Sequence, residues 1–140
     1  MSLSMHIIYA ARHLLDVGHS DVVRDHPGLS QSDLSVLLSV HDEPGLTAKH
    51  IAKLLGRDKT TVSRSVAGLI RDGFIRSEID SLDGRRRNLF LTEEGLGPTR
   101  QAANRIREEI ERLTDHMTSE HVDMLNDFLR NLLPQKSPLK

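Results

Sequence analysis

Apolar residues near the start of the chain recur three or four positions apart, which is the spacing of one helix face. Residues 4–24 show this pattern and are predicted to form an amphipathic helix. Pro27 and Gly28 follow, and the residue before a proline avoids helical dihedrals, so we expect the helix to stop before them. Ser30 is placed to cap a second helix, which Pro44 and Gly45 end.

Two shorter helices are predicted next, joined by three residues. Thr47 is placed to cap the first helix and Gly56 to end it. Asp58 or Thr60 is placed to cap the second helix, which Gly73 ends. The apolar residues expected to face inward are Ile51, Leu54, Leu55, Val62, Val66, Leu69 and Ile70. Two short helices with a short, glycine-containing connection are typical of a helix-turn-helix.

The pattern then changes from helical spacing to alternation. Residues 74–80 place Ile75 and Ile79 on one face, which predicts a short strand, and residues 88–92 predict a partner strand. The charged residues 81–87 between them are predicted to form the tip of a hairpin. Such a two-stranded hairpin after a helix-turn-helix is called a wing.

Two more amphipathic helices are predicted after the wing. Thr92 is placed to cap the first, and Thr118 or Ser119 to cap the last, which Pro134 ends. Their apolar positions are Ala103, Ile106, Ile110, Leu113, Met117, Val122, Leu125, Phe128, Leu129 and Leu132. This spacing suits packing along another helix.

A proline lies near the start of the first of these two helices. Pro98 has no N–H group to bond to the carbonyl of Glu94. We therefore expect either a kink or a delayed helix start at Gly97 and Pro98.

Charge is distributed unevenly along the chain. Residues 47–90 contain ten Lys and Arg against five Asp and Glu, a net charge of +5, although the whole chain has a formal charge of −1. The rest of the chain is therefore acidic, at −6. A polyanion would be attracted to the middle of the chain and repelled by its ends.

Composition narrows the class of protein. Aromatic residues make up 3% of the chain against 37% hydrophobic residues, so the core must be aliphatic. The absence of cysteine excludes disulfides and thiolate metal sites. No transmembrane segment or signal peptide is recognised, so we expect a cytoplasmic protein that does not contact the membrane. No Ser-His-Asp pattern or glycine-rich phosphate motif is found, and we expect neither an enzyme nor a cofactor.

The stretch from Leu46 to Gly95 carries a family resemblance. It contains a helix-turn-helix, an apolar-Gly-apolar exit, an Asp-x-Arg wing and a closing Leu-Thr-x-x-Gly, in the sequence LTAKHIAKLLGRDKTTVSRSVAGLIRDGFIRSEIDSLDGRRRNLFLTEEG. The pattern resembles the MarR (multiple antibiotic resistance regulator) family, and the layout of elements extends the resemblance to nearly the whole chain.

The expected fold class is mainly α with a small two-stranded β wing. It is a winged helix-turn-helix with N- and C-terminal dimerisation helices in a single MarR-type domain, residues 1–140. Residues 30–95 are expected to form the DNA-binding lobe, 4–24 and 96–133 the helical dimerisation region, and 134–140 a frayed tail.

The second short helix is predicted to be the recognition helix. A helix enters the major groove when its inner face is apolar and its outer N-terminal face is short, polar and partly cationic. The residues that meet this description are Lys59, Thr60, Thr61, Ser63 and Arg64. A solvated polar helix face is the alternative, and the neighbouring cationic wing favours DNA.

The wing supplies the other candidates. The resemblance implies that Arg85 inserts into a narrow minor groove and that Asp83, across Gly84, holds its guanidinium in one orientation. Gly84 is expected to allow positive φ. Arg86 and Arg87 are expected to contact phosphates or to solubilise the hairpin tip. The alternative for Asp83 and Arg85 is an exposed ion pair of little consequence for folding.

These features predict a transcriptional regulator that binds specific sequences in double-stranded DNA. We expect a homodimer on a pseudo-palindromic operator, acting as a repressor that a small ligand releases. One alternative is a metal-responsive regulator of the same fold, for which the candidate ligands are His13, Asp16, His19, His41 and Asp42. Scattered surface histidines explain the same residues without a metal. The other alternative is a winged helix that binds protein and no DNA.

Overall fold

The computed structural model describes residues 1–133, and the predicted tail and its Pro134 helix stop lie outside the described residues. The elements, in order, are α1 (Leu3–Val23), α2 (Gln31–Asp42), α3 (Ala48–Leu55), α4 (Lys59–Arg71), β1 (Ile75–Ile79), β2 (Arg87–Leu91), α5 (Glu93–Thr114) and α6 (Ser119–Leu132). The predicted fold class, mainly helical with a two-stranded wing, is confirmed.

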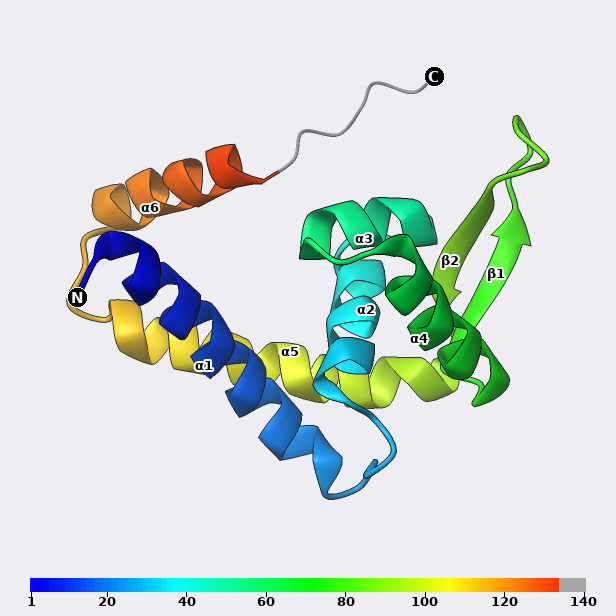
Figure 1. Ribbon diagram of the computed structural model, residues 1–140. Helices are drawn as coiled ribbons and strands as arrows, with labels where there is room; N and C mark the ends of the chain where they lie inside the picture. The colour runs from blue at the N-terminus through cyan, green and yellow to red at the C-terminus, as the bar shows by residue number, and fades with distance from the viewer. Residues whose placement is uncertain (134–140) are drawn as a thin grey trace.

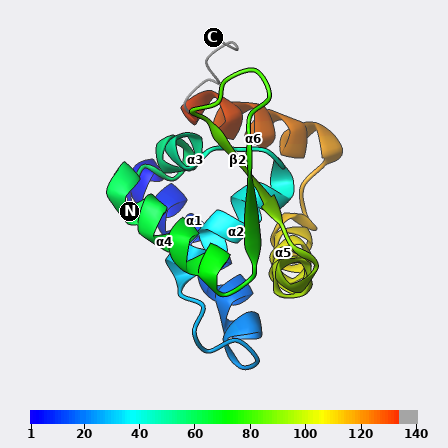
Figure 2. The same cartoon turned by 90° about the vertical axis from the view of Figure 1, so that its right-hand side faces the viewer.

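The molecule consists of a helical scaffold and a lobe that carries the wing. α1 and α5 lie side by side, and α5 continues beneath the lobe formed by α2, α3, α4 and the hairpin (Figure 1). The hairpin projects from the lobe away from α5, as a view turned by 90° also shows (Figure 2). α5 therefore contacts both the scaffold helix α1 and the wing-bearing lobe.

Local capping explains where the lobe's helices begin. The Ser30 hydroxyl accepts a hydrogen bond from the Asp33 N–H at 3.0 Å, and the Asp33 carboxylate accepts one from the Ser30 N–H at 3.1 Å. This reciprocal capping box starts α2. Thr47 caps α3 as predicted, and Gly56 ends it in the left-handed region at φ 64°.

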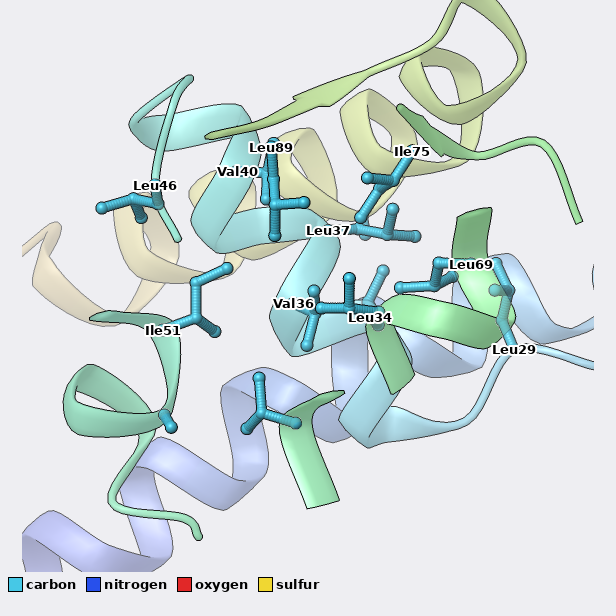
Figure 3. Packing of buried hydrophobic residues seen from close by; sticks show 14 of the residues in the cluster. Leu29, Leu34, Val36, Leu37, Val40, Leu46, Ile51, Leu69, Ile75 and Leu89 are labelled. Carbon is cyan, nitrogen blue, oxygen red and sulfur yellow. The ribbon is translucent and has the colours of Figure 1, made fainter. Parts of the chain in front are cut away.

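The core fills the lobe with aliphatic side chains from every surrounding element. Leu34 and Leu37 of α2 meet Ile51 of α3, Leu69 of α4 and Ile75 of β1, all fully buried (Figure 3). Each such side chain contributes roughly 1.5–3 kcal/mol through burial. This shared core holds α4 and the hairpin in one fixed relation.

Two isoleucines of the predicted elements are exposed, and one of them, Ile70, was predicted to face inward. Ile70 is 40% exposed, because it lies one helix position beyond Leu69, and Leu69 takes the core side of α4. Ile79 is 61% exposed although it shares a strand face with the buried Ile75. Its partner is Arg87, at the end of the hairpin beyond the core. The predicted burial of Ile70 is therefore wrong.

The wing is an antiparallel pair in which Ser77 lies opposite Leu89. Leu89 also bonds to the segment before α3: its carbonyl accepts the Gly45 N–H at 2.8 Å, and its N–H donates to the Leu46 carbonyl at 2.9 Å. Arg87 was predicted to lie in the hairpin tip, but it is the first residue of β2. The wing is thus tied by backbone hydrogen bonds to the start of α3.

The long helix α5 begins without delay despite its proline. The Thr92 hydroxyl accepts the Gly95 N–H at 3.1 Å and donates to the Gly73 carbonyl, which fixes the helix start. Pro98 is buried inside α5. It removes a single backbone bond, so the cap prevails and the predicted delayed start is wrong.

A buried carboxylate joins α1 to α5. Glu109 is 4% exposed, and its Oε1 lies 3.0 Å from Nε2 of His13. Arg112 donates to the same carboxylate, and Arg105 lies 3.6 Å from its Oε2. The Arg112 hydrogen bond, followed by that from His13, lowers the pKa of Glu109 to about 2. The carboxylate is therefore ionised at any ordinary pH.

Candidate nucleic-acid interface

The outer face of α4 gathers most of the predicted recognition residues. Asp58 caps the helix, and Val62, Val66 and Leu69 turn inward. The opposite side forms a shallow depression lined by Lys59, Thr60, Ser63, Arg64 and Ala67. Four of the five predicted residues therefore lie together on one outward surface.

The fifth predicted residue, Thr61, has a structural partner. Its N–H donates to Asp58 Oδ2 at 3.0 Å and its hydroxyl donates to Asp58 Oδ1 at 2.6 Å. These two bonds, the side-chain one first, lower the pKa of Asp58. The hydroxyl proton of Thr61 is thus used in the cap, and only the oxygen lone pairs remain for another donor.

In the wing, Asp83 orders the backbone and not the arginine side chain. Its Oδ1 accepts the backbone N–H of Arg85 at 3.0 Å. Among residues 1–133 no ion pair joins the Asp83 carboxylate to the Arg85 guanidinium. The structure therefore does not contain the predicted contact by which Asp83 would orient this guanidinium. The backbone N–H of Arg85 is a nearer donor for the Asp83 carboxylate than the Arg85 guanidinium, so it takes the hydrogen bond. Gly84 does not have positive φ, since the described glycines that do are Gly45, Gly56 and Gly73.

A large groove lies between α3, α4 and the wing, and Lys59 is the residue that it shares with the depression on the outer face of α4. It measures about 1090 Å³ and is lined by residues of α3, α4, the wing and the loop before α3. Its cationic residues are Lys49, Lys53, Lys59, Arg85, Arg86 and Arg87, and its acidic residues are Glu43 and Asp83. Within the described part of the chain, none of these six cations takes part in an ion pair. The groove is therefore strongly electropositive.

Sequence reasoning missed the contribution of α3. Lys49, His50 and Lys53 line the groove, yet none of them was among the predicted DNA-binding residues. The signal was present, because they lie opposite the apolar face that contains Ile51. Only the packing of α3 against α4 and the wing shows which way that polar side faces.

The candidate metal ligands do not converge. His13 contacts Glu109, and Nε2 of His19 lies 2.7 Å from the carbonyl of Leu29. Over residues 1–133, no group of three or more His, Asp or Glu side chains is arranged to hold an ion. Asp16 instead accepts a hydrogen bond from Gln31.

A helix-turn-helix whose second helix stands exposed beside a two-stranded wing defines the winged-helix class of proteins. Residues 22–86 match the model of the MarR family. Just under half of the chain therefore resembles the MarR family of winged helix-turn-helix transcriptional regulators. Members of this family are regulators and not enzymes, in agreement with the sequence-based expectation.

Two relatives illustrate the sequence similarity. The chain is 30% identical over 109 residues to the HTH-type transcriptional regulator PetP of Rhodobacter capsulatus, covering 63% of this chain and 64% of PetP. It is 31% identical over 90 residues to the regulator TtmR of Methylorubrum extorquens, covering 64% of this chain and 46% of TtmR. The chain therefore spans less than two thirds of the length of either protein.

Solved structures show the same fold. The transcriptional regulator SlyA superposes with a TM-score of 0.74 at 21% identity, covering 94% of this chain and 92% of SlyA. A Listeria monocytogenes protein assigned to the MarR family and crystallised with a 26mer DNA gives a TM-score of 0.77 at 20% identity, covering 94% and 87%. In the part of the chain that the structure describes, no helix is long and apolar enough to cross a bilayer.

Proposed function

We propose that the chain regulates transcription by binding specific sites in double-stranded DNA through α4 and the wing. The observation that carries this proposal is the electropositive groove between α3, α4 and the hairpin, whose six Lys and Arg lack ion-pair partners within residues 1–133. Unpaired cations on a concave surface suit a polyanion, because each phosphate they neutralise releases counterions. The Listeria relative crystallised with DNA supports the same role.

The two surfaces divide the work of recognition. Arg64 and its neighbours on α4 read base edges in the major groove, where arginine bonds guanine in a bidentate manner. Arg85 enters the adjacent minor groove, while Arg86 and Arg87 contact phosphates. Thr61 contributes through its oxygen or its methyl group, since its proton is held by Asp58.

The regulator acts as a homodimer. Residues 30–95 form the DNA-binding lobe, and residues 4–24 and 96–133 form the dimerisation region. No residue of α6 is buried, and large apolar side chains on α1, α5 and α6 are exposed: Ile8, Tyr9, Ile110, Leu113, Leu125, Phe128, Leu129 and Leu132. Exposed apolar surface of this extent favours association. A two-fold pair would place two α4 helices about 34 Å apart, on a pseudo-palindromic operator.

Binding represses transcription, and a small ligand relieves the repression. A relative that is 27% identical over 115 residues is the HTH-type transcriptional repressor YetL of Bacillus subtilis, which supports the sign of regulation. The groove also has apolar walls at Val66 and Ile70, which suits a small ligand with both apolar and anionic parts. Such a ligand releases DNA only if it binds the DNA-free state more tightly.

Duplex binding at several salt concentrations tests the proposal. Affinity should fall steeply with salt, with a slope of about −0.9 per phosphate contact. Arg64→Ala should weaken binding to a selected site more than binding to random duplex. Arg85→Ala should weaken binding mainly to sites that have A·T-rich flanks. Arg107→Ala is the matched control, because Arg107 lies on α5, pairs with Glu111 and is not part of the groove. A flat salt response, or equal loss for all three variants, contradicts the proposal.

The dimer is tested separately by sedimentation. Leu129→Asp places a charge on the apolar side of α6 and should shift the protein toward monomer. Asp123→Ala on the same helix should leave the oligomeric state unchanged. A monomeric wild-type protein at micromolar concentration contradicts the dimer.

A further inference from the structure

The tip of the wing presents a leucine to solvent. Leu82 is 95% exposed, more than any other large apolar side chain of the described chain, even more than Met1 at the N-terminus. It lies three residues before Arg85, within the hairpin that also contains Arg86 and Arg87. A single exposed leucine is common on protein surfaces, so it is the position of Leu82 beside cationic residues of the wing that points to a partner.

A network of hydrogen bonds holds this tip in one shape. The Asp80 Oδ1 accepts the N–H of Leu82 at 2.8 Å and the N–H of Asp83 at 3.2 Å. Its Oδ2 accepts from the Asn88 side chain at 3.1 Å, which ties the turn to the opposite strand. The backbone adds bonds from Asp80 N–H to the Arg86 carbonyl at 2.9 Å and from Arg86 N–H to the Asp83 carbonyl at 3.0 Å. The backbone of Leu82 is thus fixed rather than frayed.

The ionisation of Asp80 supports this arrangement. The hydrogen bond from the Leu82 N–H, followed by that from the Asn88 side chain, lowers the pKa of Asp80. The carboxylate therefore remains charged and accepts all three bonds across the physiological range. It also places a negative charge near the arginines, an arrangement that bare phosphate affinity does not favour.

We propose that Leu82 is a specificity-determining residue that enters the minor groove beside Arg85, and that Asp80 is the residue that positions it. This inference rests on the proposed DNA-binding function. The occupant follows from charge: the tip carries Arg85 and Arg86, Arg87 follows at the start of β2, and narrow minor grooves hold enhanced negative potential. Leucine is among the apolar side chains that proteins insert at base steps from the minor groove.

This role predicts a particular kind of sequence preference. A leucine at a base step opens the stack, and pyrimidine–purine steps open most easily. The preference should therefore fall on flanking positions that no polar side chain reads. Asp80 acts through Leu82, because it bonds the backbone of the tip and no base.

The experiment begins with selection of bound duplexes from a random pool. The wild-type protein should show a preference for flexible steps at positions flanking the α4 contacts. Leu82→Ala should flatten that flanking preference and weaken the selected site about tenfold, which corresponds to about 1.4 kcal/mol. Its affinity for random duplex and its salt slope should not change, since no charge is altered. The central, α4-dependent preference should also remain.

Two charge-matched variants test the positioning residue. Asp80→Ala and Asp80→Asn remove the same charge, but asparagine keeps a carbonyl oxygen that can accept the N–H groups of Leu82 and Asp83. Asp80→Ala should flatten the flanking preference although Leu82 is present, and Asp80→Asn should largely restore it. The double variant Asp80→Ala, Leu82→Ala should have a flanking sequence preference no flatter than that of Leu82→Ala alone.

The outcomes separate this inference from the proposed function. A wild-type protein that binds no duplex overturns both. If the wild-type protein selects a site and Leu82→Ala retains the flanking preference, only the role of Leu82 is overturned. Equal behaviour of Asp80→Ala and Asp80→Asn overturns the role of Asp80. Circular dichroism of each variant should show an unchanged helical content, which checks that the variant is folded.

Discussion

Replacing Gly95 with alanine should destabilise the protein at the junction between α5 and the lobe that carries the wing. Gly95 lies in the first turn of α5 against the backbone of Phe74, which joins α4 to β1. An added Cβ would lie 2.0 Å from the Phe74 carbonyl oxygen, 2.9 Å from its carbonyl carbon and 3.2 Å from its Cα. All three are backbone atoms, so no side-chain rotation can relieve the clash.

The expected loss of stability is large for the addition of one methyl group. The Phe74 carbonyl accepts the Thr92 N–H at 3.1 Å, and the Phe74 N–H donates to the Leu69 carbonyl at 2.9 Å. Moving Phe74 therefore disturbs both the cap of α5 and the end of α4. Overpacking typically costs about 1–3 kcal/mol or more, and alanine regains about 0.5–1 kcal/mol of helix propensity. The clash is at the severe end, so we expect a net loss of about 3 kcal/mol, or about 150-fold in the folding equilibrium.

Urea unfolding followed by far-UV circular dichroism measures this loss, at one protein concentration because association is linked to stability. Gly68→Ala is the matched control. A Cβ at Gly68 would meet only the mobile end of Arg71 at 3.5 Å, so this variant should gain about 0.5–1 kcal/mol. If Gly95→Ala proves as stable as the wild-type protein while Gly68→Ala gains, the close approach of α5 to Phe74 is refuted.

Three further predictions concern stability. The pKa of Glu109, lowered to about 2 chiefly by the Arg112 hydrogen bond, lies below its unfolded value of 4.5, so its contribution is present above pH 4.5 and is lost as pH falls toward 2. Glu109→Gln should therefore destabilise the protein at pH 7 and show a weaker acid dependence in thermal unfolding between those pH values; an unchanged dependence contradicts the link. Leu37→Ala removes a fully buried side chain and should cost about 2–5 kcal/mol in urea unfolding, against less than about 0.5 kcal/mol for the exposed Leu82→Ala; similar losses would refute the assigned core. Ser30→Ala should cost about 1 kcal/mol by removing the cap of α2, and Ser30→Asp should restore most of it, since both oxygens accept the same N–H; failure of that rescue would contradict the capping role.

The elements that sequence reasoning predicted well are those governed by local chemistry. Ser30, Thr47 and Thr92 cap helices because a hydroxyl reaches an N–H two or three residues ahead, whatever the rest of the fold does. Gly56 ends α3 because its missing Cβ permits a left-handed backbone. The position of the helix-turn-helix followed from these signals, and that of the hairpin followed from the alternation in residues 74–80.

The errors occur where neighbours in space decide. Ile70 has the spacing of an inward helix residue, yet Leu69 takes the core side of α4 and leaves Ile70 exposed. Asp83 has an arginine two residues away, but the nearer backbone N–H of Arg85 takes its carboxylate. Pro98 lies inside α5 because the cap at Thr92 fixes the helix start ahead of it.

By itself, the sequence determined the order of helices and strands, the excess of positive charge in the middle of the chain and the outward residues of α4, because spacing, caps and composition are properties of neighbouring residues. Only the tertiary structure decided that α3 contributes Lys49 and Lys53 to the same groove as the wing. It also decided that Asp80 fixes the hairpin tip and that Leu82 stands exposed there. These properties depend on the direction in which separate segments face once a shared core has packed, and periodicity along one segment does not contain that information.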